Sequence, residues 1–162
     1  MPDGNKSGPI HVALTFNDAF WAPAYATMRS ICLTTRRRGD LVFHLIHTRL
    51  TTGHAADLDK ITEEFGARLE HYELETLKVY QRAIERLRYH PRLSHLTYAR
   101  FFIDHLLDPD IKRVIYIDCD FLVLAPIDEL AEVDLEGRPI GAALCALILW
   151  RRRSLLAGRS AA

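Results

Sequence analysis

Two aspartates, Asp118 and Asp120, stand one residue apart at the end of an apolar segment, in the stretch YIDCDFLVL. On an extended chain, side chains two positions apart leave the same face. Two such carboxylates repel each other unless a cation lies between them. Mn²⁺ or Mg²⁺ suits this role, because hard cations prefer oxygen ligands and often bridge to substrate phosphates. The pair predicts a metal site, and the alternative is a pair of exposed acids in a turn.

A second candidate is Arg100, in the stretch TYAR that begins at Thr97. An arginine guanidinium can pair through two hydrogen bonds with a carboxylate or a diphosphate. Arg100 is therefore a candidate for binding an anionic ligand, and the alternative is a solvated helix arginine or a structural ion pair.

The third candidate is the segment TFNDAFW, from Thr15 to Trp21, which follows an alternating apolar stretch. Its small polar groups could contact a base or a ribose, and Phe20 could stack on a base. The alternative is a turn with Asn-Asp chemistry followed by aromatic residues of the core.

The elements that must position these residues follow from apolar periodicity. Alternation predicts a strand from Ile10 to Thr15, and the apolar run LVFHLI predicts a strand that is buried on both faces, as in a parallel sheet. Cap residues and helical spacing predict the helices, with Gly39 and Gly66 ending the first two. The expected strands are 10–15, 41–46, 68–72, 113–117 and 139–144, and the expected helices are 22–36, 52–65, 77–87 and 94–107, with Pro126 ending regular structure.

This order of elements predicts an α/β domain with a mostly parallel sheet flanked by helices. Ligands bind beyond the carboxyl ends of the strands in such sheets. Both the Asp118–Asp120 pair and the segment after Thr15 are expected at such ends. We expect a loose arm over residues 1–9, the domain over 10–145 and an atypical tail over 146–162.

Composition limits the class of protein. The 162 residues are a usual length for one domain, and 21 basic residues balance 21 acidic ones, which argues against a nucleic-acid-binding protein. The three cysteines are far apart and predict free thiols in a reducing cytosol. The N-terminal segment lacks the apolar core of a signal peptide, and no apolar run has the length of about 20 residues that a membrane span needs, so we expect a cytoplasmic protein.

Three segments together resemble glycosyltransferase family 8, the retaining galactosyl- and glucosyltransferases with a GT-A fold. They are HVALTFND, SHLTYARFF and KRVIYIDCDFLVLAPIDEL, and the similar stretch runs from about Ile10 to Leu144. The resemblance implies transfer of a hexose from a UDP-sugar to a hydroxyl of a saccharide, lipid-linked or protein acceptor, with retention of configuration.

The resemblance also implies roles for single residues. Asp118, Cys119 and Asp120 look like the family's DxD segment, in which the aspartates bind Mn²⁺ or Mg²⁺ and, through the ion, the UDP diphosphate. Arg100 matches the arginine of the family's YAR segment, which helps to hold the sugar nucleotide.

The segment from Thr15 to Phe20 matches the part of the family that receives uracil. Phe20 stands where a tyrosine often stacks on the base, and Asp18 matches one of the acidic residues. Asn17 stands where an aspartate is common, so altered contacts with uracil are expected.

The family pattern ends after Gly141-Ala142-Ala143, where the sequence continues with LCALILWRRRSLLAGRSAA. The family's Asn-Ala-Gly segment and late histidine ligand are not found there, so a truncated or frame-shifted member is expected and no catalytic nucleophile or base is nominated. The Arg151–Arg153 run is either a solvated basic end or a patch for peripheral contact with a membrane.

Two other classes of function stay open at this point. A phosphatase of the haloacid-dehalogenase type also places DxD after an apolar strand, although Leu122 stands where that class has Thr or Val. The other alternative is a non-catalytic fragment that binds a nucleotide or a protein partner.

Overall fold

The computed structural model of the chain describes residues 8–86 and 95–142. Residues 1–132 form one compact unit and residues 133–162 form another. Every helix and strand named below belongs to the first unit. The predicted division into an arm, a domain and a tail stays a prediction. In the described ranges, no helix is long and apolar enough to cross a membrane.

The first unit is built on a parallel sheet of four strands in the order β3-β2-β1-β4. The strands are β1 (Ile10–Phe16), β2 (Leu41–His47), β3 (Arg68–Glu73) and β4 (Ile115–Tyr116). All seven residues of β2 are buried, as its apolar run predicts for a central strand of a parallel sheet. The predicted α/β architecture with a parallel sheet is therefore confirmed.

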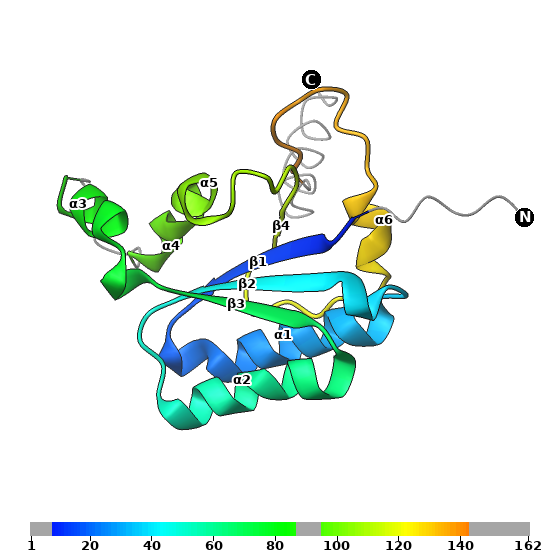
Figure 1. Ribbon diagram of the computed structural model, residues 1–162, viewed down its shortest axis with the longest axis horizontal. Coiled ribbons are helices and arrows are strands. Elements are labelled where there is room, and N and C mark those ends of the chain that lie inside the picture. The colour runs from blue at the N-terminus through cyan, green and yellow to red at the C-terminus, as the bar shows by residue number, and fades with distance from the viewer. Residues whose placement is uncertain (1–7, 87–94, 143–162) are drawn as a thin grey trace, which may run out of the picture. The chain divides into compact units, whose positions relative to one another are not determined.

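Two long helices, α1 (Trp21–Thr34) and α2 (Thr52–Phe65), cover one face of the sheet (Figure 1). Their apolar sides pack against alternate residues of β1 and β2 in the main core. The N-terminus of α2 is capped by Thr51, whose hydroxyl accepts a hydrogen bond from the His54 N–H, and α2 ends at Gly66 with φ +71°. The cap pattern in the sequence predicted both ends.

The other side of the sheet carries α3 (Lys78–Arg86), α4 (Leu96–Ala99) and α5 (Ile103–Leu106) (Figure 1). A second, smaller core joins these helices to the sheet through Ile46, Leu74, Tyr80 and Ala99. Short 3₁₀ turns link the main elements, at Asp18–Phe20, Arg38–Asp40, Leu74–Thr76 and Arg100–Phe102.

Two predicted helices differ from the structure. α1 ends at Thr34, because the Thr34 hydroxyl bonds back to carbonyls of its own helix and Thr35 is extended, so Gly39 caps nothing. The helix predicted from Ser94 to Leu107 is broken into α4, a 3₁₀ turn and α5. Ser94 itself lies outside the described residues.

The predictions for the C-terminal third need three further corrections. Only Ile115–Tyr116 of the predicted strand 113–117 pair with β1. Pro126 does not end regular structure but precedes α6 (Ile127–Ala131), whose first turn carries acidic residues that favour a helix N-terminus. Residues 139–142 form no strand, and the rest of the strand predicted at 139–144 lies outside the described residues.

Candidate functional site

Arg100 and Asp118, which the sequence predicted separately, form an ion pair near the carboxyl ends of β1 and β4. The Arg100 Nη2 atom lies 3.3 Å from Asp118 Oδ1. Arg100 begins the 3₁₀ turn that follows α4, and its Nε–H donates to the Thr97 carbonyl at 3.0 Å. Both side chains are partly exposed, 37% for Arg100 and 48% for Asp118, so a ligand in solvent has access to them.

Tyr116 connects this ion pair to the end of β1, a role that sequence reasoning missed. Its hydroxyl donates to Asp118 Oδ1 at 3.1 Å and lies 2.7 Å from the Thr15 hydroxyl. Because Tyr116 has one proton to donate, the Thr15 hydroxyl donates to the Tyr116 oxygen. The Arg100 guanidinium lies over the Tyr116 ring, 4.8 Å from its centroid, in a cation–π contact.

Burial raises the pKa of Tyr116 above its ordinary value, and the Thr15 hydrogen bond opposes this rise. The hydroxyl therefore keeps its proton at neutral pH and remains a donor toward Asp118. The sequence signal that could have identified Tyr116 is its position: it precedes Asp118 by two residues, where the chain leaves the short strand β4.

Asp120 is exposed and makes no hydrogen bond or ion pair within residues 8–86 and 95–142. The chain turns at Cys119 and Asp120, so the extended geometry assumed for the pair ends at Asp118. In the described part of the chain, no group of three or more His, Cys, Asp or Glu side chains could hold a metal ion. Two carboxylates nevertheless fit Mn²⁺ or Mg²⁺, since such ions commonly take one or two carboxylates and fill their remaining positions with phosphate oxygens and water.

Two buried hydroxyls of α1 hold the segment that follows β4. The Thr27 hydroxyl lies 2.9 Å from the Cys119 carbonyl and 2.7 Å from the Phe121 carbonyl. The Val123 N–H donates to the Ser30 hydroxyl at 2.9 Å. Sequence reasoning missed both residues, and buried polar side chains on the core face of a helix are the signal that could have found them.

Cys119 was predicted to contact the nucleotide-sugar, and its side chain is buried in the main core. Burial raises the pKa of its thiol to about 11. The Cys119 backbone carbonyl already accepts a hydrogen bond from Thr27. The backbone N–H is therefore the group through which Cys119 could contact a ligand. Cys32 is also a buried free thiol, and Cys145 lies outside the described residues.

A hollow of about 540 Å³ lies beyond the carboxyl ends of β1, β2 and β3, between the sheet and α3. Asn17 lines it, and the Asn17 Oδ1 atom is buried without a hydrogen-bond partner among the described residues. A buried amide oxygen without a donor is costly, so this atom has an unmet capacity to accept a hydrogen bond. The hollow is lined by Asn17, Thr48, Leu74, Glu75, Tyr80, Gln81, Ile84, Glu85, His95 and Leu96.

Asp18 and Phe20 lie in the loop between β1 and α1. Asp18 Oδ1 accepts hydrogen bonds from the Thr51 N–H at 2.9 Å and from the His54 ring at 2.8 Å. The Thr51 hydrogen bond, with help from His54, lowers the pKa of Asp18. Asp18 therefore ties this loop to the start of α2, while Phe20 is 45% exposed and free to meet a ligand.

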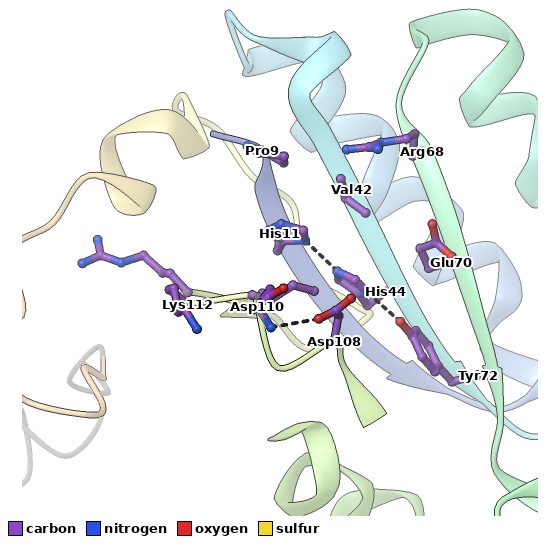
Figure 2. A pocket seen from close by; sticks show the side chains of 12 residues that line it. Pro9, His11, Val42, His44, Arg68, Glu70, Tyr72, Asp108, Asp110 and Lys112 are labelled. Carbon is purple, nitrogen blue, oxygen red and sulfur yellow. Dashed lines mark hydrogen bonds between the residues drawn. The ribbon is translucent and has the colours of Figure 1, made fainter. Parts of the chain in front are cut away.

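A second hollow, of about 610 Å³, lies over the amino-terminal half of the sheet on the face away from α1 and α2 (Figure 2). A row of hydrogen-bonded side chains crosses its floor. His11 Nδ1 lies 2.9 Å from His44 Nε2, and His44 Nδ1 lies 3.1 Å from the Tyr72 hydroxyl. Both His44 nitrogens are thus occupied by protein groups, and none of the predicted site residues lines this hollow.

Comparison with known proteins places the chain in a family. The family model described as glycosyl transferase family 8 matches residues 11–157. General stress protein A of Bacillus subtilis (strain 168) is 36% identical over 141 residues, which cover 85% of this chain and 46% of that protein. Probable galacturonosyltransferase-like 10 of Arabidopsis thaliana is 28% identical over 140 residues, which cover 82% of this chain and 36% of that protein.

Two solved structures resemble the described fold. The bifunctional glycosyltransferase WbbM in its apo form matches with a TM-score of 0.65 and 22% identity, over 83% of this chain and 22% of that one. The galactosyltransferase LgtC, in complex with donor and acceptor sugar analogues, matches with a TM-score of 0.61 and 19% identity, over 78% of this chain and 43% of that one. At such low identity these likenesses show the fold alone, and they confirm the GT-A fold.

The chain spans less than half the length of each of these four proteins. The family match nevertheless covers all three of the predicted site segments, and it sets aside the phosphatase alternative. The chain belongs to glycosyltransferase family 8.

Proposed function

We propose that the chain binds the donor of a glycosyl transfer, a UDP-sugar, at the carboxyl ends of β1 and β4. The observation that carries this proposal is the bonded cluster of Thr15, Tyr116, Asp118 and Arg100, which joins a carboxylate, a guanidinium and the end of the first strand. Family membership supports the reaction: transfer of a hexose to an acceptor hydroxyl with retention of configuration.

Asp118 and Asp120 would hold Mn²⁺ or Mg²⁺ together with the diphosphate. The bound ion supplies electrostatic stabilisation for the negative charge that builds on the departing UDP. Arg100 pairs with the diphosphate oxygens, as a guanidinium suits phosphate through two parallel hydrogen bonds. Tyr116 keeps Asp118 and Arg100 in place while this happens.

The base of the nucleotide would lie in the hollow lined by Asn17. An amide offers an acceptor oxygen beside an N–H donor, and uracil presents a donor N–H beside a carbonyl acceptor, so the two edges are complementary. The unpartnered Asn17 Oδ1 supports this pairing. Phe20 would stack on the base, the Cys119 N–H would face the donor, and Asp18 would act by fixing the loop.

The acceptor would be a hydroxyl of a saccharide, a lipid-linked sugar or a protein. No described residue is assigned as the nucleophile or base of the transfer. Because the chain spans less than half the length of its relatives, donor binding is the property to measure first.

Isothermal titration calorimetry with UDP tests the proposal, in Mn²⁺ and in excess EDTA. Asp120→Ala is the informative variant, because Asp120 makes no hydrogen bond or ion pair with the described residues whose loss would disturb the fold. We expect Mn²⁺-dependent binding by the wild type and at least about tenfold weaker binding by Asp120→Ala, which is about 1.4 kcal/mol of lost binding energy. Glu63→Ala, which removes an exposed carboxylate of α2, is the matched control and should bind as the wild type does.

Equal affinity of the wild type and Asp120→Ala for UDP would show that this carboxylate holds no ion for the nucleotide. Binding that EDTA leaves unchanged would contradict the metal dependence in the same way.

A further inference from the structure

The two carboxylates of the DxD segment are not equivalent in the ligand-free chain. Asp118 Oδ1 already accepts hydrogen bonds from two side chains of the protein, the Arg100 guanidinium at 3.3 Å and the Tyr116 hydroxyl at 3.1 Å. Asp120 is exposed and receives none from the described residues. The charge of one carboxylate is thus balanced internally before any ligand arrives.

Arg100 is also held where it lies. Its Nε–H is bonded to the Thr97 carbonyl at 3.0 Å, and its guanidinium rests on the Tyr116 ring. These contacts keep a positive charge beside the carboxylate that a divalent cation would need. A cation arriving alone must compete with Arg100 for Asp118 and must sit next to a like charge.

A diphosphate changes this balance because its oxygens can pair with a guanidinium. With the diphosphate bound, Arg100 has a second anionic partner and its hold on Asp118 weakens. The negative phosphate charge also offsets the repulsion between the guanidinium and the cation.

We infer that the Arg100–Asp118 ion pair is a latch that makes the cation and the nucleotide bind cooperatively. The latch disfavours the cation in the absence of nucleotide, and the diphosphate releases it. This inference rests on the proposed function, and it adds an energetic coupling between two ligands of the same site. Such coupling is reciprocal, so each ligand raises the affinity for the other by the same factor.

The test is to measure Mn²⁺ binding without nucleotide, by the electron paramagnetic resonance signal of free Mn²⁺. Arg100→Gln removes the competing charge, so the variant should bind Mn²⁺ alone about three- to tenfold more tightly than the wild type. The same variant should bind UDP in saturating Mn²⁺ about tenfold more weakly, because the diphosphate loses its arginine. A general folding defect would weaken both affinities, and the latch moves them in opposite directions.

Arg82→Gln is the matched control, since it removes one exposed positive charge from α3 and should change neither affinity. Arg100→Lys keeps the charge but not the planar group, so its Mn²⁺ affinity should stay near that of the wild type. Mn²⁺ binding by Arg100→Gln that is equal to or weaker than that of the wild type overturns the latch.

The outcomes for the latch and for the proposed function are separable. If Mn²⁺-dependent UDP binding is present and Arg100→Gln binds Mn²⁺ no more tightly, the latch fails and the proposed function stands. If UDP does not bind the wild type, the proposed function fails, and cooperative binding fails with it. If neither protein binds Mn²⁺ without nucleotide, Arg100 is not what keeps the cation from Asp118, and the latch is wrong.

Discussion

Acidification is expected to weaken the fold through His44, at the centre of the hydrogen-bonded row in Figure 2. The His44 side chain is buried, with 2% of the residue exposed, between His11 and Tyr72. Burial, with a smaller contribution from His11, lowers the pKa of His44 from 6.5 to about 4. The folded chain thus resists a proton that the unfolded chain accepts.

The sign of the effect follows from proton linkage. Above the unfolded pKa both states leave His44 neutral, and the residue contributes no pH dependence. Between the unfolded value of 6.5 and the folded value of about 4, the unfolded state binds more protons, so stability falls as pH falls. Below the folded pKa both states are protonated and the loss is complete.

The magnitude follows from the gap between the two pKa values. One pKa unit corresponds to about 1.4 kcal/mol, so the complete loss is about 3 kcal/mol. Between about pH 7.5 and about pH 4.5, linkage gives about 2.5 kcal/mol from His44 alone. This is a large share of the stability of a typical domain, which is about 5–15 kcal/mol.

Urea unfolding, followed by circular dichroism at several pH values, measures this loss. His44→Gln removes the titrating ring and keeps a hydrogen-bonding side chain. Over the same pH range, the free energy of unfolding of this variant should therefore fall by about 2.5 kcal/mol less than that of the wild type. The substitution also changes stability independently of pH. This change is the difference between the two free energies of unfolding near pH 8, where His44 is neutral in both states, and it is subtracted from the values at lower pH. Parallel curves for the two proteins would refute the reasoning, as would an NMR titration that places the folded pKa of His44 above 6.

Two further substitutions test the residues that hold the DxD segment. Tyr116→Phe keeps the ring under Arg100 and removes the hydroxyl. Calorimetry should show that the Mn²⁺-dependent affinity for UDP is lower by about fivefold, which is about 1 kcal/mol. An unchanged affinity would contradict a positioning role for the hydroxyl. Thr27→Val removes the hydroxyl that the Cys119 and Phe121 carbonyls share as a donor, so it should lower the free energy of unfolding by about 1–3 kcal/mol and weaken UDP binding. Thr34→Val is its control in calorimetry, because that hydroxyl bonds only within α1; equal effects of both on UDP binding would deny Thr27 any role at the site.

The sequence predicted best those elements that have a clear apolar pattern along the chain and are buried in the core. β1 and α2 have clear periodicity, β2 is a continuous apolar run, and α2 also has Thr51 and Gly66 at its ends. The short segments from 94 to 132 were predicted less well. Their ends depend on single long-range or side-chain contacts, such as the Arg100 bond to the Thr97 carbonyl where the predicted helix tightens into a 3₁₀ turn.

The candidate site divides in the same way. Asp118, Asp120 and Arg100 were identified because residue type and family resemblance point to them, and the structure brings Arg100 to Asp118. Tyr116 and Thr27 were missed, because their partners Thr15 and Cys119 lie 101 and 92 positions away in the chain. Periodicity carries no information about such contacts.

The shortness of β4 explains why α1 must take part in the site. Only two residues of β4 pair with β1, so the backbone from Cys119 to Val123 leaves the sheet without ladder partners. Backbone groups at the edge of a core need partners, and here Thr27 and Ser30 supply them. The segment that carries Asp118 and Asp120 is therefore positioned by a helix that the sequence placed more than 80 residues earlier than β4, on the order of half the chain. A substitution on the buried side of α1 should consequently act on the proposed nucleotide site through hydrogen bonds, without touching the ligand.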